Sequence, residues 1–166
     1  MDRADRALEQ WRRERPDLDV RPMAVIGRLT EAALLVSRDR LAPVFARFGL
    51  QQGEFDVLAT LRRSGSPYAL TPTALYEATM VSSGAMTNRL DRLERAGLIR
   101  REPHPGDRRG VTVHLTDQGR AVIDEAVTAH VENEHAILSA LTEGERDALA
   151  ALLAKLIAGL EPQDGG

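Results

Sequence analysis

Four polar side chains between residues 82 and 88 have the chemistry needed to recognise nucleotide bases. They are Ser82, Ser83, Thr87 and Asn88. Hydroxyl and amide groups carry hydrogen-bond donors and acceptors that can meet base edges in the major groove of duplex DNA, and an asparagine can form two hydrogen bonds with one adenine. These residue types therefore predict contact with DNA and not a chemical reaction.

Arginines follow these polar side chains in the chain. They are Arg92, Arg100, Arg101, Arg108 and Arg109, with Asp107 next to the last two. Guanidinium groups suit phosphate oxygens, and two adjacent arginines at the tip of a loop suit a narrow minor groove. Asp107 is placed to orient Arg109. The alternative for this charged loop is a solvated turn without a partner.

A helix from about Ser83 to Ala96 is expected to present the polar side chains. Ser82 or Ser83 can cap its free amides, and Gly97 can take the left-handed conformation that ends it. At the helical repeat its apolar residues fall on one face, and the polar ones project elsewhere. The residues expected to point inward are Met86, Leu90 and Leu93 on the helix and Leu98 directly after Gly97. One face is thus free to meet a partner.

Two strands are expected directly after this helix. Residues 99–102 form the first, and residues 111–115 alternate apolar and polar side chains, as a half-covered strand does. The connection over residues 103–110 is longer than a tight hairpin needs, so it predicts a projecting loop. Helix and hairpin together predict a winged helix-turn-helix, a mainly α fold with a small β-wing.

Further helices are expected on both sides of this unit. An N-terminal helix over residues 2–15 ends at Pro16, and a long helix over residues 23–48 bends or divides at Pro43. The remaining helices are expected over residues 54–63, 72–80, 116–141 and 142–160. The last has an apolar stripe from Leu149 to Leu160, which needs a partner helix.

The composition limits the class of protein. The formal net charge is -3, and the acidic excess lies in residues 120–166, a segment that phosphate would repel. The chain has no cysteine, which excludes a disulfide framework and a thiolate metal site. No segment approaches the roughly 20 apolar residues that span a bilayer, and the charged N-terminus has no apolar signal segment. We expect a cytoplasmic protein without a membrane partner.

The chain resembles the MarR family of bacterial ligand-responsive transcription factors from Met23 to Leu160. The similar motifs are GEFDVLATLRRSG at 53–65, SSGAMTNRLDRLERAGLIRR at 82–101 and DRRGVTVHLTDQG at 107–119. The resemblance implies a homodimer whose N- and C-terminal helices interlock, with one recognition helix in the major groove of each half-site. It implies dimerisation segments at 1–48 and 116–166 around a DNA-binding lobe at 49–115. A two-fold dimer also predicts a pseudo-palindromic operator.

Within that family the chain is similar to the urate-responsive branch, which has an extra N-terminal helix with a tryptophan. The resemblance implies a ligand site formed by Trp11, Asp56, Arg63 and Arg89. The ligand would be a small anion, with urate-like, carboxylic-acid and phenolic compounds all open. Each residue also has a structural alternative: Trp11 could staple the arm to the core, Asp56 and Arg63 could form a surface pair, and Arg89 could hold a phosphate.

Other functions remain as alternatives. His130 and Glu134 are four residues apart on one helix and could chelate a divalent ion, although no third ligand is evident. We therefore expect no metal and no cofactor. Enzymatic motifs such as a phosphate loop or a nucleophile elbow are missing from the sequence. The competing class is a constitutive architectural DNA-binding protein, or a protein-docking module that uses the winged helix without responding to a ligand.

Overall fold

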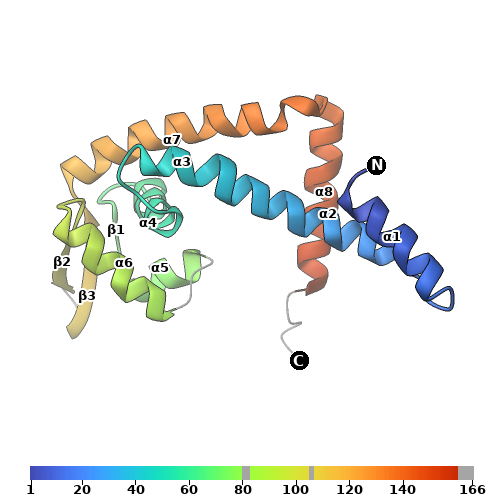
Figure 1. Ribbon diagram of the computed structural model, residues 1–166. Coiled ribbons are helices and arrows are strands. Elements are labelled where there is room, and N and C mark those ends of the chain that lie inside the picture. The colour runs from blue at the N-terminus through green and yellow to red at the C-terminus, as the bar shows by residue number, and fades with distance from the viewer. Residues whose placement is uncertain (80–82, 105–106, 161–166) are drawn as a thin grey trace.

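The molecule consists of a small lobe at one end of two long helical segments (Figure 1). The computed structural model describes residues 1–79, 83–104 and 107–160, with the backbone alone for residues 83, 84, 104 and 107–109. The first long segment comprises α2 (Arg21–Leu35), η1 (Val36–Leu41) and α3 (Ala42–Ala46). The second is α7 (Asp117–Ile137), which lies against η1 and α3.

The predicted interruption near Pro43 is confirmed, and it takes the form of a π-helix. Proline has no amide hydrogen, so the carbonyl of Asp39 loses its helical donor. The chain widens just before this point, where the Ala42 amide donates to the Ser37 carbonyl. The side chain of Asn133 on α7 donates to the Arg40 carbonyl at 3.1 Å. The irregular turn is thus fixed to the neighbouring long helix.

The lobe contains three helices and a three-stranded antiparallel sheet. Its helices are α4 (Gln52–Arg63), α5 (Pro72–Ala78) and α6 (Ser83–Arg95). Its strands are β1 (Ala69–Leu70), β2 (Ile99–His104) and β3 (Asp107–Leu115), in the order β1-β3-β2. The apolar faces of all three helices meet β3 and α7 in one buried core. The mainly helical fold with a small wing is therefore as predicted, and β1 is the strand that the sequence pattern did not indicate.

Local signals set several helix ends. The Thr71 hydroxyl accepts from the Ala74 amide at the start of α5, and Thr116 caps α7 in the same way. Gly97 has φ 73°, the left-handed conformation that ends α6. At the start of α8 (Glu143–Leu160), Thr142 and Glu145 exchange hydrogen bonds as a capping box. The residue types alone predict the caps at Thr71 and at Thr142–Glu145 and the helix end at Gly97, and the structure confirms these three. The Thr116 cap was not predicted.

The wing differs from the prediction in the length of its strands. We expected a long loop over residues 103–110, but β2 extends to His104 and β3 begins at Asp107. The longer strand includes Pro103, which pairs with Val111 next to a shift in register. β2 is an edge strand, and a strand tolerates proline best at a sheet edge, where an amide that faces solvent makes no ladder hydrogen bond. Proline was therefore a poor marker of the end of this strand.

The far end of the long helices carries α1 (Arg3–Glu14) and α8, which follows the short helix η2 (Leu138–Ala140). Arg28 on α2 binds the carboxylates of Asp2 and Asp5 and so fastens α1 to α2. No residue of α8 is buried. Among the described helices, none is both long and apolar enough to cross a membrane.

Candidate nucleic-acid interface

The polar face of α6 is exposed, as its sequence pattern predicts. Thr87 and Asn88 are exposed to solvent, whereas Met86, Leu90 and Leu93 on the opposite face are buried in the core of the lobe. The helix therefore presents a hydroxyl and an amide on a rigid support. Ser82 and the side chain of Ser83 lie outside the described residues.

Arg92 turns from this face toward the first turn of α4. Its Nε lies 2.8 Å from Oε1 of Glu54, whose side chain is only 4% exposed, while that of Arg92 is 49% exposed. The other carboxylate oxygen of Glu54 accepts the amide of Gln51. A buried carboxylate needs such partners, because an unpaired charge in the core is costly. Arg92 thus binds Glu54 within the lobe.

Two arginines of the wing are also paired with carboxylates. Arg100 contacts Glu102 on the same strand at 2.6 Å. Arg101 reaches back to α6, where its guanidinium binds Asp91 at 2.7 Å and Glu94 at 2.5 Å. These contacts join the base of the wing to α6. They also offset part of the positive charge that the sequence predicted here.

The tip of the wing holds the remaining predicted DNA contacts. Asp107, Arg108 and Arg109 lie in the backbone of β3, at its start. Their side chains are outside the described part of the chain. The strand places them next to the β2–β3 connection, at the end of the wing farthest from Leu115, where β3 reaches the core.

Arg89 points from α6 into the first turn of α4. A Cβ at position 53 would collide with the Arg89 Cζ, so Gly53 is the residue type that leaves room for the guanidinium. The Nη1 atom of Arg89 is buried and has no hydrogen-bond partner in the described structure. Burial raises the pKa of the nearby Asp56 carboxyl, and the charge of Arg89 partly opposes this rise.

Asp56 and Arg63 line one pocket, as their helical spacing predicts. The pocket has a volume of about 430 Å³ and lies between α4 and the end of α5. Thr60 also lines it, between the two charged residues on the same face of α4. Arg63 donates to the Thr60 hydroxyl at 3.3 Å and to the Ala78 carbonyl at 3.1 Å. A carboxylate and a guanidinium therefore face one open pocket.

Trp11 does not join this pocket within one chain. It is 45% exposed and lines a separate hollow between α1 and α2 with Leu8, Met23 and Gly27. Figure 1 shows α1 at the opposite end of the long helices from α4. The expected convergence beneath Trp11 is thus not found in the single chain, because the long segment α2–α3 separates the two elements.

His130 belongs to an aromatic cluster between α3, α4 and α7. Its ring centroid lies 5.4 Å from that of Phe45 and 4.8 Å from that of Phe55. Its Nε2 lies 3.1 Å from Oε1 of Glu134, so the spacing noticed in the sequence brings the two side chains into direct contact. Among the described residues, no group of three possible ligands could hold a metal ion.

The acidic partners of Arg92 and Arg101 are Glu54, Asp91 and Glu94, which the sequence pattern did not single out. One local signal was available for Glu54, since Gln51 and Glu54 have the spacing of a capping box. The pairing of Glu54 with Arg92 depends on the approach of two helices, and no local signal indicates that.

A helix with an exposed polar face, fixed to a β-wing and preceded by two short helices, defines the winged helix-turn-helix class of regulators. The chain belongs to the MarR family, whose model matches residues 48–110. It is 52% identical to the HTH-type transcriptional regulator PecS of Dickeya dadantii over 90% of this chain and 89% of PecS. The relatives are transcriptional regulators, which confirms the expectation of a regulator and not an enzyme.

Two solved structures extend the similarity to the fold. The chain resembles Sco3205, a MarR family regulator from Streptomyces coelicolor in complex with DNA, with a TM-score of 0.79 and 26% identity over 90% of this chain and 94% of that one. It also resembles a mutant of MarR from E. coli complexed with operator DNA, with a TM-score of 0.71 and 27% identity over 88% and 96% of the two chains.

Proposed function

We propose that this regulator is a repressor that binds a pseudo-palindromic operator as a homodimer and releases it when a small anion binds. The observation that carries the proposal is the exposed pair Thr87 and Asn88 on a helix whose opposite face is buried. Two similar proteins are described in complex with DNA. Several relatives, such as NicR of Pseudomonas putida, are named repressors.

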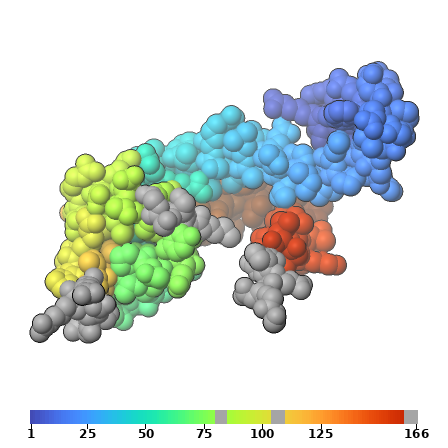
Figure 2. All heavy atoms as spheres, turned by 90° about the horizontal axis from the view of Figure 1, so that it is seen from below, coloured from blue at the N-terminus to red at the C-terminus, as the bar shows by residue number. Residues whose placement is uncertain are grey.

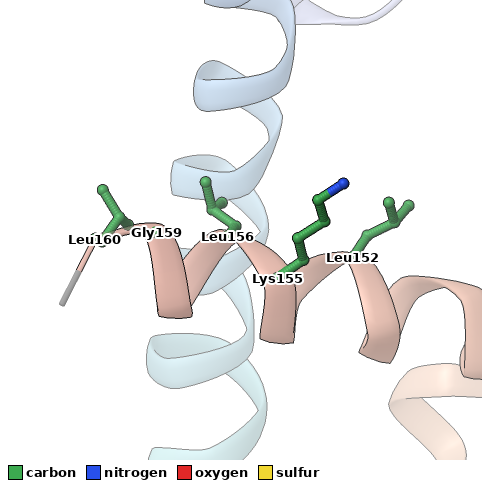
Figure 3. A pocket seen from close by; sticks show the side chains of 5 residues that line it. All are labelled: Leu152, Lys155, Leu156, Gly159 and Leu160. Carbon is green, nitrogen blue, oxygen red and sulfur yellow. The ribbon is translucent and has the colours of Figure 1, made fainter. Parts of the chain in front are cut away.

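The proposed dimer would cover apolar surface that one chain leaves exposed. Figure 3 shows Leu152, Lys155, Leu156 and Leu160 along one side of α8. The exposed large apolar residues of α2 and α8 are Met23, Val25, Ile26, Leu29, Leu34, Leu35, Leu149, Leu152, Ile157 and Leu160. Burial of one such side chain is worth roughly 1.5–3 kcal/mol. Residues 1–48 and 116–166 are therefore proposed as the dimerisation region, and residues 49–115 as the DNA-binding lobe.

On the operator, each lobe would place α6 in the major groove and its wing beside it. Ser82, Ser83, Thr87 and Asn88 would then meet base edges, and Arg100, Arg108 and Arg109 would meet phosphates or the minor groove. The half-sites of such a dimer lie about one helical turn apart. Arg92 is a weaker candidate for DNA contact, because Glu54 already binds its guanidinium.

The ligand is proposed to enter beside Asp56, Arg63 and Arg89, as in the urate-responsive branch. The buried Nη1 of Arg89 has no hydrogen-bond partner among the described residues, and an anion could accept a hydrogen bond from it. An anion would compete with Asp56 for the guanidinium, and Arg89 would carry that change into the helix that contacts DNA. Trp11 would take part only if it came from the second copy, since α1 is remote in one chain.

The test combines DNA binding with a panel of anions. The full-length protein is titrated with its own upstream region and with random duplex, and then with urate-like, tricarboxylate and phenolic compounds. We expect a preference of roughly 10³-fold for the upstream region and loss of binding as one anion quenches Trp11 fluorescence. Arg63→Ala and Arg89→Ala should uncouple the two responses. Sequence-specific binding that no anion affects would contradict the ligand switch, and binding without sequence preference would instead indicate the architectural class.

A further inference from the structure

A shallow groove between α5 and α6 carries two hydroxyl groups, of Thr73 and Tyr76, that the proposed base contacts do not use. Its volume is about 280 Å³. Met86 and Leu90, both buried, form its apolar floor. Thr73 and Tyr76 from α5 stand on one side, and Thr87 from α6 stands on the other. The groove thus joins an apolar floor to a rim of uncharged donors.

The position of this groove places it at the same surface as the base-reading face of α6. Thr87 belongs to both, so the groove and the reading face are continuous. Figure 2 shows α5, in green, on the face of the lobe that also carries the yellow-green α6. Thr73 and Tyr76 are three residues apart and share one side of α5. Both are exposed, and Tyr76 is 45% exposed despite its aromatic ring.

We propose that Tyr76 and Thr73 hold the DNA backbone beside the recognition helix through uncharged hydroxyl groups, an inference that rests on the proposed function. A deoxyribose has apolar faces that fit the floor, and its phosphate can accept hydrogen bonds from the rim. The described residues that line the groove include no acidic group to repel phosphate, since Glu77 does not line it. In helix-turn-helix proteins the helix before the recognition helix crosses the DNA backbone.

None of the described residues that line the groove is charged. α5 contains no arginine or lysine, and on α6 Arg92 is bound to Glu54 while Arg89 lies against Gly53. A backbone contact made by these lining residues therefore comes from neutral donors. Phosphate contacts position a protein on DNA without selecting sequence, and only cationic contacts release counterions and steepen the salt dependence.

A phosphate contact made by neutral donors should change DNA affinity without changing the salt dependence or the preferred sequence. A hydrogen bond to a charged group accounts for about a tenfold change in affinity. Tyr76→Phe, which removes only the hydroxyl, should weaken binding of the duplex by about tenfold per half-site. The slope of log affinity against log salt and the preferred sequence should stay those of the parent. Thr73→Val should act in the same direction.

The chain offers a matched control in its other tyrosine. The guanidinium groups of Arg62 and Arg120 lie over the ring of Tyr68, which does not line the groove, so Tyr68→Phe should leave DNA affinity unchanged. Both variants and the parent are titrated with the upstream duplex at several salt concentrations, and thermal unfolding confirms that they fold alike. Parent-like affinity of Tyr76→Phe would overturn the proposal, and so would a change in preferred sequence or in salt slope. Failure of the parent itself to bind duplex would instead refute the proposed function.

Discussion

The ion pair between Arg92 and Glu54 allows a quantitative test of how the recognition helix is held. Removal of one partner of a fully buried pair costs about 3–5 kcal/mol, whereas an exposed pair contributes about 0–1 kcal/mol. Here the carboxylate is buried and the guanidinium is half exposed. Arg92→Met, which keeps an unbranched apolar side chain, should therefore lower the free energy of unfolding by about 2 kcal/mol, between these two limits. For a domain of this size that is a fall in Tm of roughly 4–8 °C.

The assay is urea unfolding at one fixed protein concentration, since the stability of the proposed dimer would depend on concentration. Arg95→Met is the control, because Arg95 is an exposed arginine on the same helix whose contact is the Asp91 carbonyl. Its loss should stay within about 0.5 kcal/mol. In Glu54→Gln the side-chain carbonyl oxygen at position 54 can still accept the backbone N–H of Gln51, and no buried charge is left without a partner. The double variant Glu54→Gln with Arg92→Met should therefore recover most of the stability that Arg92→Met alone loses. Equal losses in the two methionine variants, or a parent-like Arg92→Met, would refute this account.

Three further predictions concern single groups. Burial raises the pKa of Asp56, so the unfolded chain loses this proton at a lower pH than the folded protein does. The parent therefore loses stability as pH rises from about 4 through the raised pKa. In urea titrations Asp56→Asn should become more stable relative to the parent from about pH 4 upward, with no gain at lower pH. Gly97→Ala should lower Tm, at a cost of about 1–2 kcal/mol, because Gly97 has φ 73°; an unchanged Tm would contradict this. Arg109→Ala should reduce the salt slope of DNA binding by about one, and a parent-like slope would show that Arg109 makes no phosphate contact.

The sequence by itself determined the helices of the lobe and several helix ends along the chain. Thr71, Gly97 and the pair Thr142–Glu145 act on amides and carbonyls within a few residues, so their effect can be predicted without the fold. The apolar repeat also predicted that Met86 is buried and Thr87 exposed. These signals are local, and the structure confirms them.

Only the tertiary structure decided which charged groups meet. Arg101 lies beyond the end of the recognition helix, yet the start of the hairpin returns it to Asp91 and Glu94. Arg92 finds Glu54 because α4 and α6 cross at that point. An arginine side chain is long and flexible, so the residue type predicts an anionic partner but not which carboxylate it will be. The path of the backbone between distant segments makes that choice.

The same reason explains the wing and the tryptophan. The pairing of β1 with β3 joins residues far apart in the chain, and two residues give too short a pattern to predict a strand. Pro103 is tolerated because β2 lies at the edge of the sheet, a position that only the strand order defines. Trp11 was placed near Asp56 by resemblance, but the rigid length of α2 to α3 keeps them apart in one chain. Long-range geometry is set by how helices and strands stack, and residue types alone leave it undetermined.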